Sequence, residues 1–143
     1  MAEAAHVFRC RVYYEDTDAA GIVYYANYLK FAERARTEML RAAGIEQRRL
    51  AEETGLGFVV SRFACEFRAP ARLDDQLDVV TRVERLRAAA IEARQEVRRD
   101  GGLLAGIDVV IACVARDGRP ARIPPPLRRA FAAFAAENSP KED

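Results

Sequence analysis

The chain has 143 residues, half of them hydrophobic, and its formal net charge is +1. This length suits one domain over residues 1–143 with a single core, and the charge balance excludes the basic footprint of a nucleic-acid-binding protein. No apolar run is long enough to span a bilayer, and the first residues lack the basic and apolar regions of a signal peptide.

The first third of the chain predicts a strand followed by a long helix. From His6 to Tyr14 every second residue is apolar or aromatic, which is typical of a strand and places Tyr14 in the core. From Tyr24 to Ala43 apolar residues recur every three or four positions, as expected for a helix about 30 Å long. Gly44 then stands where a left-handed helix cap is expected.

The rest of the chain predicts a short helix, four strands and a final short helix. The first helix covers Glu46–Glu53, and the last follows Pro124–Pro126. The strands are expected at Phe58–Phe67, Gln76–Leu86, Ala89–Arg99 and Leu103–Ala115. In the first of these strands, the residues expected to share one face are Val59, Ser61, Phe63, Cys65 and Phe67. The tail from about residue 137 is expected to fray.

This order of elements predicts an α+β fold. A helix connects only the first two strands, which excludes a doubly wound parallel sheet. Tight turns such as Asp100-Gly101-Gly102 join the later strands, which indicates an antiparallel sheet of about five strands. The long amphipathic helix needs a sheet face on which to bury its apolar stripe. The simplest arrangement is a sheet wrapped around one long central helix.

The candidate catalytic residues lie just before the long helix, in the stretch "YYEDTDAAGIVYY". A helix start offers backbone N–H groups without intrahelical partners and a partial positive charge, which suit a carbonyl oxygen. Asp18 lies a few residues earlier, close enough to attack a carbonyl carbon or to activate a water molecule. Gly21, with Ala19 and Ala20, would keep the approach open. A carboxylate beside such donors can perform acyl transfer.

The same residues also have an ordinary structural interpretation. Asp and Thr are common helix-capping residues, and Asp18 can be a cap and nothing more. Asp16 fits an exposed acid or a turn former better than a helper of Asp18. Because caps are so common, the residues alone favour the capping interpretation of Asp18.

The stretch from Arg11 to Leu40, "RVYYEDTDAAGIVYYANYLKFAERARTEML", resembles the signature of the 4-hydroxybenzoyl-CoA thioesterase family, the hotdog-fold acyl-CoA thioesterases. It is most similar to the bacterial branch encoded with the Tol–Pal envelope system. The stretch from Ala69 to Val79, "APARLDDQLDV", resembles the same branch. The shared elements of the first stretch are Tyr14, Glu15–Asp18, Gly21–Val23, Asn27-Tyr28 and Glu33–Glu38.

The resemblance implies a hotdog fold and hydrolysis of an acyl-CoA thioester without metal or cofactor. The catalytic carboxylate of the family matches Asp18, and its oxyanion donor, a backbone N–H at the helix start, matches Tyr25. The resemblance also allows Tyr14 to line the acyl pocket. It further implies a homodimer with the active site between subunits, commonly paired again into a homotetramer.

Tyr25 departs from the Tol–Pal branch, which usually has histidine at this position. The 4-hydroxybenzoyl-CoA enzymes have tyrosine there, so Tyr25 is compatible with catalysis. The departure argues against any mechanism that needs an imidazole at this position, and it leaves the acyl preference open.

Two loop arginines, Arg68 and Arg72, can hold CoA phosphates, although solvated loop charges are the commoner case. The three cysteines are widely spaced, which fits thiols in a reducing cytoplasm better than a disulfide framework. One histidine, His6, and no Cys-x-x-Cys pattern argue against a structural metal site and against a Cys/His nucleophile pair.

We therefore expect a cytoplasmic acyl-CoA thioester hydrolase that acts as a homo-oligomer. Two alternatives remain open. An acyl-thioester dehydratase on the same fold would rely on a histidine, and His6 lies outside the helix-start region. A non-catalytic acyl-CoA-binding or scaffold module of the envelope machinery would gain nothing from a carboxylate aimed at the thioester.

Overall fold

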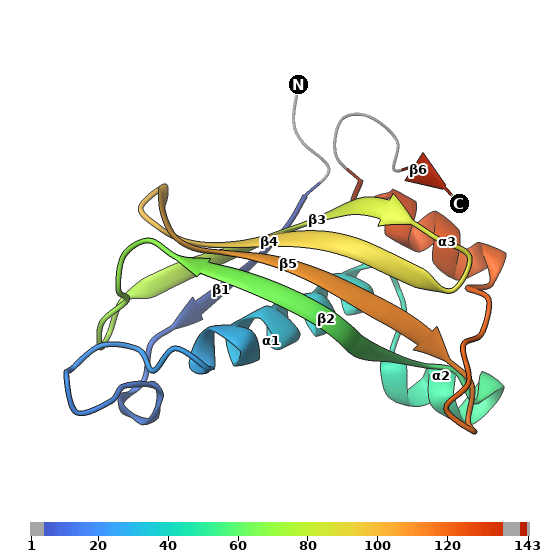
Figure 1. Cartoon of the computed structure of the whole chain (residues 1–143), viewed down its shortest axis with the longest axis horizontal. Coiled ribbons are helices and arrows are strands. Elements are labelled where there is room, and N and C mark those ends of the chain that lie inside the picture. Colours follow the sequence, from blue (N-terminus) through green and yellow to red (C-terminus); the bar gives the residue numbers. More distant parts are fainter. Residues whose placement is uncertain (1–4, 136–140, 143) are drawn as a thin grey trace.

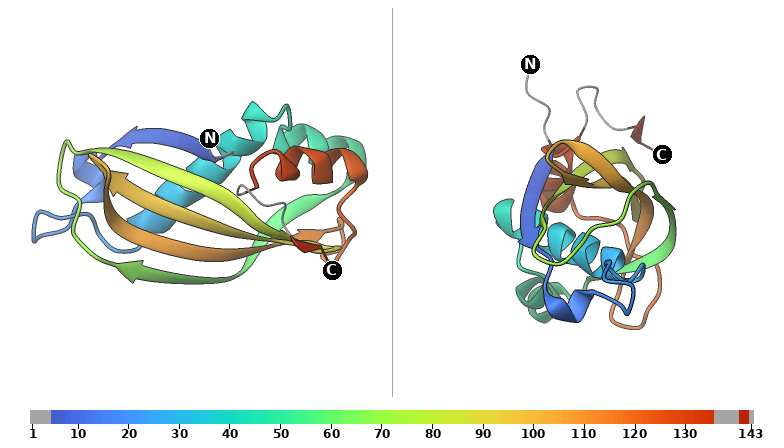
Figure 2. Two further views of the ribbon diagram at one scale, coloured as in Figure 1. Left: turned by 90° about the horizontal axis from the view of Figure 1, so that it is seen from above. Right: turned by 90° about the vertical axis from the view of Figure 1, so that its left-hand side faces the viewer.

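The computed structural model describes residues 5–135 and 141–142, in which a curved antiparallel sheet wraps around one long helix (Figures 1 and 2). The elements in chain order are β1 (His6–Arg11), the 3₁₀ helix η1 (Tyr14–Asp16), α1 (Asn27–Ala42), α2 (Gln47–Thr54), β2 (Gly57–Phe67), β3 (Gln76–Leu86), β4 (Ala90–Arg99), β5 (Gly102–Val114), α3 (Pro125–Ala132) and β6 (Lys141–Glu142). The predicted order of strand, long helix, four strands and short helix is confirmed.

The strand order across the sheet is β1-β3-β4-β5-β2, and each neighbouring pair is antiparallel. The two-residue β6 adds a short parallel pairing to the end of β3. The α+β hotdog prediction is therefore confirmed. The expectation of a frayed tail falls largely on residues 136–140 and 143, which lie outside the described residues.

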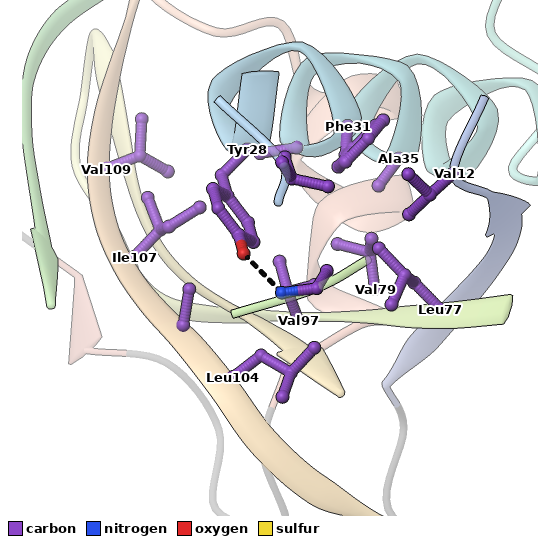
Figure 3. Packing of buried hydrophobic residues seen from close by; sticks show 14 of the residues in the cluster. Val12, Tyr28, Phe31, Ala35, Leu77, Val79, Val97, Leu104, Ile107 and Val109 are labelled. Carbon is purple, nitrogen blue, oxygen red and sulfur yellow. Dashed lines mark hydrogen bonds between the residues drawn. The ribbon is translucent and has the colours of Figure 1, made fainter. Parts of the chain in front are cut away.

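The core lies between α1 and the concave face of the sheet (Figure 3). The α1 side chains buried there recur at helical spacing and are Tyr28, Phe31, Ala32 and Ala35. The sheet residues of the same cluster include Leu77, Val79, Val97, Ile107 and Val109. Each large apolar side chain buried in this way contributes about 1.5–3 kcal/mol to folding. The helix is thus fixed against the sheet by its apolar stripe.

A fully buried glutamine interrupts this apolar interface. Gln95 donates through Nε2 to the Ala32 carbonyl at 2.9 Å and to Thr81 Oγ1 at 3.0 Å. Its Oε1 accepts from Arg36 Nη1 at 3.0 Å. Because buried polar groups need partners, this network favours a single register of α1 on the sheet.

The helix α1 ends as predicted but begins later than predicted. Gly44 has φ +85°, and the Ile45 N–H donates to the Leu40 carbonyl at 2.8 Å, which closes the last turn. The start is at Asn27 rather than Tyr24, because the Tyr24 N–H donates to the Asp16 carbonyl at 2.9 Å and holds the chain in a turn.

A β-bulge in β2 contradicts the predicted common face of that strand. The pairing of β2 with β5 shifts between Val60 and Arg62, so strand alternation changes phase there. Phe63 pairs with the buried Val109 and faces the concave side, whereas Val59 pairs with Ala112 and faces the convex side. The extra residue at the bulge is why simple alternation was wrong.

Candidate active site

The stretch between β1 and α1 forms a tight hairpin-like loop at the end of the molecule opposite α2 and α3 (Figure 1). Thr17 and Val23 pair across it, and the Asp18 N–H donates to the Ile22 carbonyl at 2.9 Å. Gly21 closes the turn with φ +82°, a conformation that favours glycine. A side chain at Gly21 would meet no protein atom within 4 Å, so the backbone conformation is the reason for glycine that the structure shows, and its role in keeping the approach of a substrate open stays a prediction.

The Asp18 side chain caps this turn and not the helix, so the helix-capping interpretation is wrong. Its Oδ1 accepts from the Ala20 N–H at 2.8 Å, and its other oxygen has no partner among the described residues. The N-cap of α1 is Ala26, and no side chain caps it. Asp18 is exposed, so its carboxylate is available to a substrate.

Two consecutive backbone N–H groups, those of Tyr25 and Ala26, have no acceptor within the described part of the chain. They immediately precede α1, where unpaired N–H groups and the helix dipole favour negative charge. The loop folds Asp18 back toward this segment, because the Asp18 N–H donates to the Ile22 carbonyl and the Tyr24 N–H donates to the Asp16 carbonyl, both at 2.9 Å. The pKa of Tyr24 is raised mainly by its hydrogen bond to the Tyr25 side chain, with a smaller contribution from the Asp18 charge. The loop thus brings a carboxylate toward a pair of unpaired donors.

An aromatic groove of about 330 Å³ adjoins these donors, a volume within the usual range of small-molecule sites. Its lining residues are Ile22, Val23, Tyr25, Tyr28, Phe67, Arg68, Ala69 and Pro70. The Tyr25 and Phe67 rings meet edge to face with centroids 6.4 Å apart, and Tyr28 meets Phe67 in the same way at 5.4 Å. The groove offers an apolar wall beside polar N–H groups.

The Tyr28 hydroxyl holds one side of this groove in place. It accepts a hydrogen bond from the Ala71 N–H at 3.0 Å (dashed in Figure 3), and both residues are buried. This bond joins the first turn of α1 to the loop between β2 and β3. Burial raises the pKa of the Tyr28 phenol, which therefore stays protonated.

Replacing this hydroxyl should lower stability measurably. Tyr28→Phe leaves the buried Ala71 N–H without an acceptor, so we expect the free energy of unfolding to fall by about 1–3 kcal/mol. Chemical denaturation measures the change. Tyr14→Phe, which alters a residue with 82% exposure, is the matched control and should change stability by less than about 0.5 kcal/mol. An unchanged midpoint in Tyr28→Phe would contradict this role.

The two predicted phosphate-binding arginines lie on the loop that borders the groove. Arg68 lines the groove and pairs with Glu66 at 3.3 Å, and its side chain is largely exposed. The backbone of Arg72 pairs with Ile22, and its N–H donates to Asp75 Oδ2 at 2.8 Å. The fold therefore brings both arginines near the Asp18 loop, and their contact with CoA phosphates stays a prediction.

The burial of Tyr14 and of Asp16 is the reverse of what was predicted, although Asp16 does form a turn as one of its two predicted roles requires. β1 ends at Arg11 and the chain turns into η1, so Tyr14 is 82% exposed rather than part of the core. Asp16 was expected to be an exposed acid or a turn former, and it is only 4% exposed but does close the η1 turn. Its Oδ2 accepts from the Tyr13 N–H at 2.8 Å, and its Oδ1 accepts from Asn27 Nδ2 at 2.9 Å. Asp16 and Asn27 each belong to a stretch that the sequence analysis singled out. Their spacing in the sequence does not reveal that they form a hydrogen bond with each other.

Other chemistry-bearing residues lie apart from the loop. His6, at the start of β1, packs edge to face on Phe134 with centroids 5.8 Å apart, and burial lowers its pKa. Burial raises the pKa of Cys10 to about 11, so its thiol is a poor nucleophile. Within residues 5–135 and 141–142, no group of three His, Cys, Asp or Glu side chains is arranged to hold a metal ion. No helix in these residues is long and apolar enough to cross a membrane.

Residues 12–131 match the family model described as the thioesterase-like superfamily. The chain belongs to this superfamily. It is 42% identical over 132 residues to the acyl-CoA thioesterase YbgC of Haemophilus influenzae, an alignment that covers 92% of this chain and 97% of that protein. It is 46% identical over 105 residues to the acyl-CoA thioester hydrolase YbgC of Escherichia coli O157:H7, with coverage of 73% and 78%.

A solved structure supports the same assignment. A probable thioesterase from Bartonella henselae superposes with a TM-score of 0.81 at 39% identity and covers 84% of this chain and 99% of that one. The thioesterase family predicted from the Arg11–Leu40 signature is therefore confirmed. As a member of the thioesterase-like superfamily, the chain carries the Asp18 loop within the matched residues.

Proposed function

We propose that this chain is an acyl-CoA thioester hydrolase whose reaction centre is formed by Asp18 and the backbone N–H of Tyr25. The observation that carries the proposal is the loop itself. It carries an exposed carboxylate, with one oxygen free of partners among the described residues, on the same hydrogen-bonded loop as N–H groups that have no acceptor there. Relatives named acyl-CoA thioesterase and acyl-CoA thioester hydrolase agree with this chemistry.

The proposed roles follow from where charge develops during hydrolysis. The thioester carbonyl oxygen becomes negative in the tetrahedral intermediate, and the Tyr25 N–H at the start of α1 stabilises that charge. Asp18 either attacks the carbonyl carbon directly or takes a proton from the attacking water. The C–S bond then breaks and CoA leaves as its thiolate, which takes up a proton. After direct attack the acyl group is left on Asp18 as an anhydride, and water cleaves it to release the free acid and restore the carboxylate; after attack by water the acid is released directly and Asp18 returns its proton to the thiolate. The aromatic groove takes the part of the acyl-CoA next to the carbonyl.

Two other functions fit the molecule less well. A dehydratase would need its histidine at the reaction centre, but His6 begins β1 while the loop follows the other end of that strand, roughly 16 Å away at 3.3 Å per residue. A pure acyl-CoA binder would leave the exposed Asp18 carboxylate without a use. The names of the relatives also favour hydrolysis.

A panel of acyl-CoA substrates tests the function. Short aliphatic, long-chain and aromatic acyl-CoAs are each incubated with the protein, and release of free CoA thiol is followed. We expect catalytic turnover of at least one class. Binding of every member without thiol release would overturn the proposal in favour of a binding module. Loss of water from a 3-hydroxyacyl-CoA would instead favour the dehydratase.

We further propose that the protein works as a homodimer joined along the free edge of β2, and that two dimers form a tetramer. β2 pairs with β5 on one side only, and its exposed large apolar residues are Val59, Val60, Phe63 and Phe67. An exposed apolar edge strand is usually covered by a partner. Phe67 also lines the aromatic groove, so this interface would bring a second subunit to the reaction centre.

A charge placed on this edge should separate the subunits. Phe63 is half exposed on the concave side of β2, so Phe63→Arg would put a guanidinium into the proposed apolar interface. We expect the mass in light scattering to fall to that of the monomer, with kcat/KM reduced about tenfold or more because the site loses its second subunit. Val7→Arg, at a similarly exposed apolar residue on the opposite edge strand β1, should leave the dimer intact.

Either of two results would contradict the edge proposal. A wild-type monomer with full activity would exclude any functional dimer. A Phe63→Arg protein that stays dimeric would exclude this edge as the interface.

We propose the cytoplasm as the site of action and the Tol–Pal envelope system as the biological context. The described cysteines Cys10, Cys65 and Cys113 are free, which suits a reducing compartment. The Tol–Pal context rests on the resemblance of the Arg11–Leu40 stretch to that branch. The acyl group preferred by this chain is what the substrate panel would identify.

A further inference from the structure

We propose that Asp16 is a positioning residue that fixes the distance between the Asp18 carboxylate and the Tyr25 N–H. This inference rests on the proposed function of Asp18 and Tyr25 and assigns a role to a residue outside that pair. Asp16 contacts both the start of the loop that carries Asp18 and the segment that carries Tyr25.

At the start of the loop, Asp16 both donates a hydrogen bond to Tyr13 and accepts one from it. The Asp16 N–H donates to the Tyr13 carbonyl at 3.0 Å, and the Tyr13 N–H donates to Asp16 Oδ2 at 2.8 Å. These two bonds close η1. Asp18 follows two residues later, with Thr17 paired to Val23 between them. The place from which the Asp18 turn projects is therefore set by Asp16.

On the side of the helix start, Asp16 holds the residues that flank the unpaired donors. Its carbonyl accepts from the Tyr24 N–H at 2.9 Å, and its Oδ1 accepts from Asn27 Nδ2 at 2.9 Å. Tyr25 and Ala26 lie between these two anchors. One residue thus fixes both ends of the segment whose N–H groups would face the thioester oxygen.

The burial of Asp16 indicates that it positions other groups and does not itself react with the substrate. Asp16 is 4% exposed and Asn27 is 7% exposed, and both Asp16 carboxylate oxygens are already used as acceptors. A substrate in the groove meets the exposed Asp18 instead. Asp16 therefore acts through Asp18 and Tyr25, and its replacement should affect turnover more than substrate binding.

Exchanging the two partners tests the proposal. In Asp16→Asn the amide oxygen can still accept from the Tyr13 N–H, but its NH2 then faces the Asn27 NH2, and a bond reforms only if the Asn27 amide turns over and then without the carboxylate charge. We expect kcat to fall about tenfold to a hundredfold while KM stays within about threefold, since small misplacements of reacting groups cost that much. Asn27→Asp alone puts two carboxylates face to face and should also lower kcat. The double variant Asp16→Asn/Asn27→Asp restores a donor opposite an acceptor, so kcat should return to within about fivefold of wild type.

Two further variants and one spectroscopic readout complete the experiment. Glu15→Gln changes an exposed carboxylate one residue earlier and is the matched control, expected to keep wild-type kcat. Asn27→Ala keeps the Asp16 carboxylate but releases the helix start, and it should lower kcat even if the exchanged pair fails to fold. Amide NMR of Tyr25 and Ala26 should show shifts in Asp16→Asn that return in the double variant, which is a result independent of turnover.

Several outcomes would overturn the proposal. Wild-type kcat in Asp16→Asn or in Asn27→Ala would remove the positioning role. A folded double variant without recovery of kcat and of the amide shifts would show that Asp16 does not act through Asn27. Asp18→Asn, measured in the same series, tests the proposed function separately. Full turnover in Asp18→Asn together with recovered amide shifts in the double variant would refute the Asp18 assignment alone.

Discussion

Asp18→Asn is expected to lower kcat for acyl-CoA hydrolysis by roughly two orders of magnitude or more, the usual scale for losing a general base or nucleophile. The side chain is exposed, and its one hydrogen bond in the described structure is accepted by Oδ1 from the Ala20 N–H. An asparagine oxygen can accept the same bond, so the turn should persist. Thermal unfolding and the oligomer mass should therefore match those of wild type.

A matched control is available elsewhere in the chain. Asp117 caps its own turn in the same way, with Oδ1 accepting from the Arg119 N–H at 3.0 Å, and it is also exposed. Asp117→Asn removes a carboxylate from an equivalent turn far along the sequence and should leave kcat unchanged. A similar loss in both variants would point to turn structure or net charge rather than to chemistry at Asp18.

Changes at Tyr25 should separate the backbone from the side chain. If the backbone N–H is the oxyanion donor, Tyr25→Phe should keep kcat within about tenfold of wild type, because only a hydroxyl hydrogen bond of about 1 kcal/mol is lost. Tyr25→Pro removes the N–H itself and should lower kcat by about a hundredfold or more. No hydrogen bond within the described residues uses this N–H, so the proline variant loses little native bonding.

The competing account gives the phenol a catalytic role as a proton donor or a group that orients water. It predicts that Tyr25→Phe loses as much turnover as Asp18→Asn. Thermal unfolding of Tyr25→Pro is the necessary control, because proline also restricts the preceding Tyr24. A proline variant that unfolds with wild-type cooperativity but has no turnover would support the backbone donor.

The fold was predictable because its elements follow simple periodicities. The helical spacing of Phe31, Ala32, Ala35 and Met39 matched the stripe that α1 buries, and Gly44 marked its end. Alternation also located β3, where Leu77, Val79, Thr81 and Val83 are buried. These patterns are local, so they can be seen in a single sequence.

The errors came from interactions that local periodicity does not show. The Tyr24 N–H is taken by the Asp16 carbonyl, so the helix starts at Asn27 although its apolar pattern extends earlier. The bulge near Ser61 is defined by pairing with β5, which alternation within β2 does not reveal.

The candidate site was predictable only in part. The Arg11–Leu40 signature indicated Asp18 and Tyr25, and the structure places them on one loop. Asp16 was expected to be an exposed acid or a turn former, and the turn is present, but acids in a polar stretch are usually exposed and its burial was missed. Its burial depends on Asn27, which is eleven residues away and belongs to the first turn of α1.

Steady-state kinetics of Asp18→Asn and Tyr25→Phe on one good acyl-CoA substrate test the central claim most directly. Both variants should be compared with wild type at the same oligomer mass and with unfolding midpoints measured in parallel. We expect kcat to fall by roughly a hundredfold or more in Asp18→Asn and to stay within about tenfold in Tyr25→Phe. Near-normal turnover in Asp18→Asn would contradict its catalytic role, and equal, severe losses in both variants would contradict the backbone-donor account.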